Sequence, residues 1–153
     1  MKRLLLRLLW VGALAGGGWW LWQRVCVTDA QRVQRQLSGL AHAVETGRWM
    51  KLEDGIAHDY SDDFGFDKAT VIGGVRSFRA QYDALLIFIT SLKIEVAPDH
   101  QTAQAIFIAK VLAKAHGTIR ESEIRADRYR VYFRKIDGGW KMTRLESPQL
   151  KFE

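Results

Sequence analysis

Beyond residue 28, apolar positions first recur every three or four residues, which is the spacing of one face of a helix. The stripe follows Thr28-Asp29-Ala30-Gln31, a capping box in which Thr28 is the N-cap and Gln31 reaches back to it. Gly47 is the natural stop. The apolar stripe consists of Val33, Leu37, Leu40, Ala41 and Val44. The pattern predicts a helix between Thr28 and Gly47.

Two shorter helices are predicted next, on either side of a polar loop. The second runs from Trp49 to about Ala57, with Trp49, Leu52, Glu53 and Ile56 on one side. The loop spans residues 58–66, and Asp67 after it is a candidate N-cap for a third helix. The stripe of that helix is Val71, Val75, Phe78 and Tyr82.

Gly73 and Gly74 interrupt the third helix. A glycine inside a helix costs about 1 kcal/mol relative to alanine. Close packing against a neighbouring element would explain why both are there.

After Tyr82 the chain becomes rich in β-branched and apolar residues, which is typical of strands. Pro98-Asp99-His100 and Asp137-Gly138-Gly139 are turn sequences, and the second is a hairpin signal. The predicted strands cover residues 85–96, 102–114, a stretch within 119–135, and 140–147. Helices followed by an antiparallel meander indicate an α+β fold.

The amino-terminal segment has the pattern of a membrane anchor. Lys2, Arg3 and Arg7 give it a positive start, and residues 4–23 are about 20 residues long, enough to span a bilayer. The positive-inside rule then leaves the amino terminus in the cytoplasm and places the body across the membrane. We therefore predict a single-pass anchor over residues 1–25, with an exported domain over residues 26–153.

Two other interpretations of this segment stay open. Ala13-Leu14-Ala15 matches the small-residue pattern before a signal-peptide cleavage site. A buried core helix is the other, and it is disfavoured by the three consecutive glycines at 16–18.

The charge of the chain does not favour nucleic acid as a partner. The net charge is +6, but four of the 23 basic residues and none of the 17 acidic ones lie in the first 25 residues. The remainder has 19 basic against 17 acidic residues, so it lacks the basic footprint of a nucleic-acid-binding domain. Cys26 is the only cysteine, which excludes an intramolecular disulfide.

Three features together resemble the nuclear-transport-factor-2-like superfamily, also called SnoaL-like. They are the loop His58-Asp59-Tyr60-Ser61-Asp62-Asp63-Phe64 between helices, the strand Ile106-Phe107-Ile108-Ala109-Lys110-Val111, and the hairpin formed by residues 129–142. The resemblance covers roughly residues 29–148 and is to small exported bacterial members of undefined activity, which implies a bacterial inner membrane protein with its domain in the periplasm. It implies a cone in which three N-terminal helices pack on a curved antiparallel sheet, with an interior that can hold a small ligand. Members include isomerases, dehydratases and cyclases as well as non-enzymatic assembly proteins, so the fold alone assigns no chemistry.

The candidate pocket residues come from strand alternation and from this resemblance. Alternation places Arg125, Asp127 and Tyr129 on the face that continues into Val131 and Phe133. Asp127 between a cation and a phenol is a candidate for orienting a ligand or for a general base, although an ordinary ion pair with Arg125 that fixes the geometry of the sheet edge is the simpler explanation. The resemblance implies that the region of the polar loop reaches the cavity in some enzymes. The complete candidate set is Asp127, Arg125, Tyr129, Tyr60, Asp59, His58, Tyr82 and Trp140.

No metal or cofactor is expected. Asp59, Asp62, Asp63 and Asp67 form an acidic cluster, but their spacing does not match the twelve-residue calcium loop. Asp67 as a helix cap and Asp62-Asp63 as turn residues account for most of it.

Two strand faces that point away from the cone are candidates for contact with solvent or with another molecule. Arg128, Arg130 and Arg134 form a basic stripe with Tyr132 among them, for which a solvated sheet face is the simplest explanation. Ile106, Ile108 and Leu112 alternate with the polar residues Gln104, Lys110 and Lys114 on one mixed face. Such a face suits a homodimer formed sheet to sheet.

These observations favour a membrane-anchored, outward-facing binding or assembly module without catalytic activity, whose partner is a protein or a small apolar ligand. The alternative is an isomerase- or dehydratase-like enzyme with acid–base residues in the cone. An enzyme should show a closed pocket with a desolvated acid or histidine, whereas a scaffold should show a cavity filled by its own aromatic side chains and an exposed apolar sheet.

Overall fold

The computed structural model describes residues 28–116, 118–121 and 128–147. Three helices come first and the strands follow, as predicted. The elements are α2 (Asp29–Thr46), α3 (Trp49–Gly55), α4 (Lys68–Arg79), β1 (Ala84–Val96), β2 (Thr102–Ala115), β3 (Thr118–Glu121), β4 (Arg128–Ile136) and β5 (Gly139–Glu146).

The helix ends follow the capping signals in the sequence. The Thr28 side chain accepts a hydrogen bond from the backbone N–H of Gln31, and Gly47 ends α2 in the left-handed conformation with φ 68°. The Asp67 carboxylate accepts a hydrogen bond of 2.8 Å from the backbone N–H of Thr70 at the start of α4. Tyr82 lies beyond the end of α4, so the predicted third helix was about one turn too long.

The strands form one antiparallel sheet in the order β1-β2-β4-β5, with β3 paired to β2. The stretch predicted to contain the third strand holds two, β3 and β4. Asp137 and Gly138 both have positive φ, as a two-residue hairpin turn requires, and they connect β4 to β5. The pairing of β1 with β2 shifts between Thr90 and Lys93, where Ser91 has φ 53°. A bulge of this kind bends and twists a strand, which favours a curved sheet.

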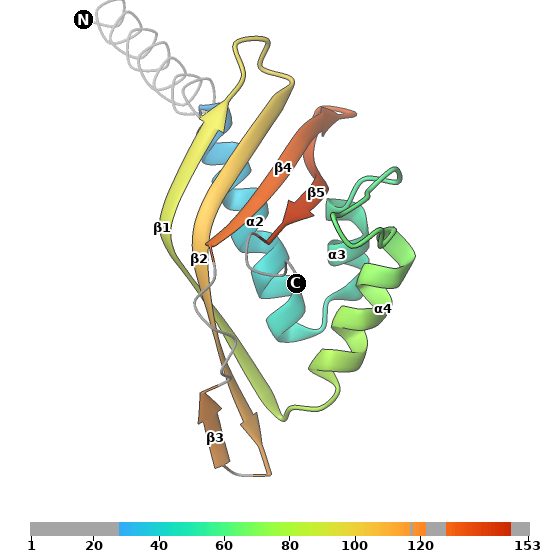
Figure 1. The fold of residues 1–153 in the computed structure, drawn as a ribbon, viewed down its shortest axis with the longest axis vertical. Helices are drawn as coiled ribbons and strands as arrows, with labels where there is room; N and C mark the ends of the chain where they lie inside the picture. The colour runs from blue at the N-terminus through green and yellow to red at the C-terminus, as the bar shows by residue number, and fades with distance from the viewer. Residues whose placement is uncertain (1–27, 117, 122–127, 148–153) are drawn as a thin grey trace, which may run out of the picture.

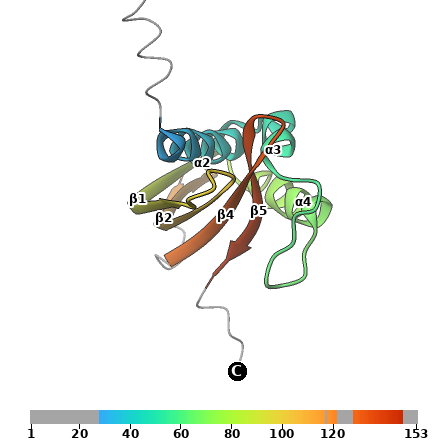
Figure 2. The ribbon, with the colours of Figure 1, turned by 90° about the horizontal axis from the view of Figure 1, so that it is seen from above.

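Figure 1 shows the sheet as a curved layer, with α2 running behind it and α3 and α4 beside it. Seen from above, α2 lies along one face of the sheet, and no helix of the described residues covers the opposite face (Figure 2). We call these the inner and the outer face. The core lies between the inner face and the helices, and its most deeply buried large side chains are Phe133, Ile56, Val33 and Val131.

The hypothesis that Gly73 and Gly74 allow close packing is wrong. A Cβ atom at either position would meet nothing within 4 Å. The closely packed glycine is Gly55, where a Cβ atom would overlap the Leu40 side chain and lie 2.7 Å from Nε2 of Gln36.

None of the described helices is long and apolar enough to cross a membrane. The predicted anchor over residues 4–23 lies outside the described residues.

Candidate functional site

A cavity of about 430 Å³ lies between the inner face of the sheet and the helices. The helices line the cavity with Leu37, Leu40 and Val44 of α2 and with one face of α4. The residues on that face of α4 are Val71, Gly74, Val75 and Phe78. The sheet side is lined mainly by Leu85, Ile87, Ile89, Phe107, Val111, Tyr129 and Val131.

The described lining is almost entirely apolar. It contains no acid, no base and no amide, and Tyr129 carries its only side-chain hydroxyl. The Tyr129 ring stacks on Phe107, with the ring centroids 5.9 Å apart and the planes at 28°. This part of the site can hold an apolar group, and the Tyr129 hydroxyl is the one described side-chain group in the lining that could exchange a proton with a ligand.

Strand alternation correctly predicted the two faces of the described part of β4. Val131 and Phe133 are buried in the core and Tyr129 is half-buried against it. Arg128 and Arg130 are exposed. Arg125 and Asp127, the strongest polar candidates, lie outside the described residues.

Tyr129 is the one described candidate that lines the cavity, and the three candidates from the polar loop lie elsewhere. Asp59 is exposed, and both of its carboxylate oxygens accept hydrogen bonds of 2.8 Å from the same guanidinium nitrogen of Arg134, which hold the pKa of its carboxyl below the ordinary value. Tyr60 is buried, and its hydroxyl donates a hydrogen bond of 3.5 Å to Asp62; burial first, and then this carboxylate, raise its pKa. His58 is exposed and lines a separate cleft with residues of α3 and α4.

The remaining two candidates have packing roles. The half-buried Tyr82 ring contacts Phe78, with the ring centroids 5.1 Å apart. Trp140 is buried in the core, and the Lys135 ammonium lies 5.1 Å from the centroid of its ring. Neither lines the cavity.

The acidic cluster stabilises the loop between α3 and α4. The buried Asp62 carboxylate accepts hydrogen bonds from the backbone N–H groups of Phe64 at 2.9 Å and Phe66 at 2.8 Å. Asp63 forms an ion pair with Arg144 of β5. The roles predicted for Asp62 as a turn residue and for Asp67 as a helix cap are therefore confirmed.

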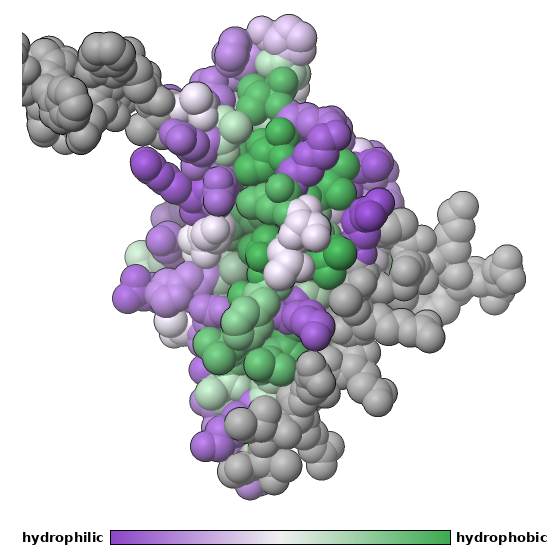
Figure 3. Space-filling model, turned by 90° about the vertical axis from the view of Figure 1, so that its left-hand side faces the viewer, coloured by the Kyte–Doolittle hydropathy of each residue, from purple (hydrophilic) through white to green (hydrophobic). Residues whose placement is uncertain are grey.

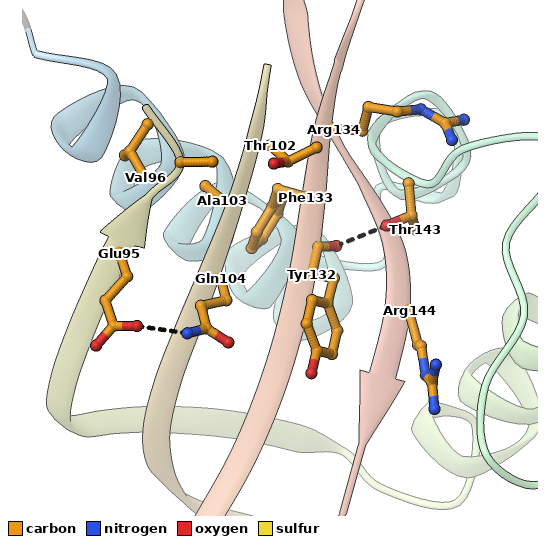
Figure 4. Close-up of a pocket in the computed structure, with 11 residues that line it drawn as sticks. Glu95, Val96, Thr102, Ala103, Gln104, Tyr132, Phe133, Arg134, Thr143 and Arg144 are labelled. Atoms are coloured by element: carbon orange, nitrogen blue, oxygen red, sulfur yellow. Dashed lines mark hydrogen bonds between the residues drawn. The ribbon is translucent and has the colours of Figure 1, made fainter. Parts of the chain in front are cut away.

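A second hollow, of about 620 Å³, lies near one end of the sheet between β1, β2, β4 and β5 (Figure 4). Its polar side chains already have partners within the chain. Glu95 accepts a hydrogen bond from Gln104, and the Tyr132 hydroxyl donates one of 3.1 Å to Glu146. Arg134 and Arg144 are paired with Asp59 and Asp63 of the polar loop. The hollow therefore offers a ligand little uncompensated charge.

The molecule carries apolar surface on its β1 side, where Figure 3 shows a stripe of hydrophobic side chains along the long axis with hydrophilic ones beside it. Leu86 and Phe88 of β1 are 53% and 47% exposed. They pair with Leu112 and Lys110 of the mixed face that the sequence suggested for a dimer.

The sequence pattern identified most cavity-lining residues only as core. Val71, Val75 and Phe78 form the apolar stripe of α4 and border the cavity, although Val71 and Val75 also pack against the core and Phe78 contacts Tyr82. The pair Gly73-Gly74 was the one sequence feature that distinguished α4 from a helix packed in a core. The sequence alone did not show that Gly74 borders a cavity.

Comparison with solved structures shows the same fold at low sequence identity. A nuclear-transport-factor-2-like protein with a cystatin-like fold from Novosphingobium aromaticivorans is 20% identical, with a TM-score of 0.63 over 82% of this chain and 84% of that one. A proposed scytalone dehydratase from the same organism is 13% identical (TM-score 0.65; 76% and 80% covered). A proposed aromatic ring hydroxylase from that organism is 20% identical (TM-score 0.65; 78% and 87% covered).

No curated protein matches the chain. A family model does match: the SnoaL-like domain aligns with residues 26–146, which include every helix and strand described above. The chain belongs to the SnoaL-like domain family.

Proposed function

We propose that the chain is a membrane-tethered, outward-facing binding module whose cavity takes a small apolar ligand. The observation that carries this proposal is the cavity of about 430 Å³ with a lining that offers almost no polar atoms. Pockets for small ligands occupy roughly 300–1,000 Å³ and are lined mainly by apolar side chains.

The cavity is partly open to solvent, so water contacts its apolar lining in the free protein. Ordered water needs several polar partners, and the described lining does not provide them. Removing apolar surface from water contributes about 25 cal/mol per Å². An apolar ligand that covers this lining is therefore stabilised by the burial of both surfaces.

Gly74 and Gly73 supply a matched pair of variants to test ligand binding. Gly74 lines the cavity, whereas Gly73 lines the separate cleft between α3 and α4. Both are exposed glycines of the same helix, and neither Cβ atom would meet a neighbour. Gly74→Leu should therefore place a side chain in the cavity, and Gly73→Leu should not.

The experiment measures binding of N-phenyl-1-naphthylamine, an uncharged fluorophore, to the full-length chain held in lipid-free peptidiscs. We expect saturable binding whose Kd rises by about tenfold or more in Gly74→Leu, equivalent to about 1.4 kcal/mol, and stays nearly unchanged in Gly73→Leu. Equal effects of the two variants, or no saturable binding to the wild-type chain, would contradict the proposal. Circular dichroism of each variant controls for folding.

The tether is proposed from the charge pattern of residues 2–24 and the length of the run over residues 4–23. The full-length chain should sediment with membranes and resist extraction by alkaline carbonate. A protease added outside the inner membrane should cleave the domain. A soluble form beginning near residue 16 would show a cleaved signal peptide instead.

An enzyme of isomerase or dehydratase type is the second candidate, because two structural neighbours are described as a proposed dehydratase and a proposed hydroxylase. The described lining contributes no acid or histidine, so this function would depend on residues such as Asp127. Liquid chromatography coupled to mass spectrometry of a ligand after prolonged incubation separates the two functions, because an isomer has the same mass as the ligand but a different retention time. Unchanged ligand supports the binding module, and conversion that Asp127→Asn abolishes supports the enzyme.

A further inference from the structure

We infer that the cavity accepts an unbranched hydrocarbon chain, the tail of a fatty acid or of a phospholipid, rather than an oxygenated aromatic ring system. This inference rests on the proposed binding function and specifies its ligand. Each hydroxyl or carbonyl group that a ligand buries must find a hydrogen-bond partner or lose several kcal/mol of solvation. The described lining supplies such a partner at Tyr129 alone. The buried part of the ligand should therefore carry few polar groups or none.

The aromatic rings of the lining already have partners within the chain. Phe107 and Tyr129 stack on each other, and Phe78 packs against Tyr82. Aromatic ligands gain from stacked or edge-to-face contacts with aromatic side chains, typically with ring centroids 4.5–7 Å apart. A flat ring system would be limited to the ring faces and edges that these pairs leave accessible.

The rest of the surface that surrounds the cavity is aliphatic, with leucine, isoleucine and valine side chains from both helices and sheet and the flexible thioether of Met142. Such a surface can contact a flexible chain on several sides without directional requirements, and each buried methylene contributes about the same free energy. No charged side chain of the described residues lines the cavity, so a carboxylate or phosphate head group remains outside. Affinity should then follow the length of the tail more than the identity of the head.

The test uses cis-parinaric acid, a fluorescent fatty acid, bound to the full-length chain in lipid-free peptidiscs. Four competitors are compared: palmitate, palmitoyl-lysophosphatidylcholine, naphthalene and 1,8-dihydroxynaphthalene. We expect palmitate to displace the probe with at least about tenfold higher affinity than either ring compound. Shortening the saturated fatty acid from sixteen to eight carbons should weaken its binding progressively. Displacement by the lysolipid would identify a tail whose head group lies outside, and displacement by palmitate alone would identify a free fatty acid.

Gly74→Leu and Gly73→Leu again serve as the cavity variant and its control. The inference requires that Gly74→Leu lower the affinity for parinaric acid by about tenfold or more and that Gly73→Leu leave it nearly unchanged. Equal or stronger displacement by either naphthalene compound would overturn the hydrocarbon-chain inference while leaving the proposed binding function intact. If neither the fatty acid nor the uncharged fluorophore binds the wild-type chain, the proposed function fails with it.

Discussion

Replacing Gly74 by alanine should make the domain more stable, which is the opposite of what close packing at this helix would give. Gly74 lies within α4, it is exposed, and an added Cβ atom would meet nothing within 4 Å. The substitution therefore removes the conformational cost of a helical glycine without a steric penalty. That difference is about 0.5–1 kcal/mol. For a domain of this size it corresponds to an increase in Tm of roughly 2–4 °C.

Gly55→Ala is the contrasting control. Gly55 is buried at the end of α3, and its added methyl group would overlap the side chains of Leu40 and Gln36. Overpacking of this kind typically destabilises by about 1–3 kcal/mol. Thermal unfolding of the full-length chain, followed by circular dichroism, should move in opposite directions for the two variants. A lower Tm for Gly74→Ala would mean that α4 packs against a neighbour at this position, and the reasoning about the cavity would fail with it.

Three further predictions concern the polar loop, acid stability and the outer face. Asp62→Ala should lower the free energy of unfolding by about 2–3 kcal/mol in urea titrations, because the backbone N–H groups of Phe64 and Phe66 lose a charged acceptor. Asp63→Ala, which breaks an exposed ion pair, should change this free energy little. The hydrogen bond from Lys135 holds the pKa of Asp29 in the folded protein below its ordinary value of 3.8. The ionised Asp29 therefore contributes its full stabilisation above pH 3.8, and this contribution is lost as the pH falls through the pKa of the folded state. Asp29→Asn should flatten this part of the acid-unfolding curve. We expect a homodimer through the outer face, which Phe88→Lys should convert to monomers in sedimentation velocity, and a monomeric wild-type protein would contradict that expectation.

The fold was predictable from the sequence because its signals are local. Thr28, Gly47 and Asp67 act through the backbone within a few residues, so a capping pattern determines where each helix begins or ends. The turn at Asp137-Gly138 works in the same way, since two residues with positive φ connect the strands directly. Alternation along β4 identified which side chains face the core because one face of the sheet is covered and the other is not.

The candidate site was harder to predict because polar residue types do not reveal their partners. The resemblance implies that the region of Asp59 reaches the cavity, but Arg134, 75 residues away in sequence, pairs with Asp59 on the exposed surface. Tyr60 and Trp140 have reactive or polar side chains and yet are buried as part of the core. Each of these roles depends on contacts between distant segments, which a single sequence does not contain.

A cavity is harder still to recognise, because it depends on how far apart the surrounding elements lie. Apolar residues that line a cavity have the same periodicity as residues that fill a core, and Val75 of α4 cannot be told from Val33 of α2 by pattern alone. Gly55 and Gly74 show the same ambiguity: one glycine permits close contact, and the other lies beside open space. Apolar surface that stays in contact with water makes the free protein less stable than it would be with that surface buried. A bound hydrocarbon stabilises the folded state by removing that surface from water. Ligand binding at this cavity should therefore raise the Tm of the wild-type chain and raise it much less in Gly74→Leu, whose added side chain occupies part of the same space.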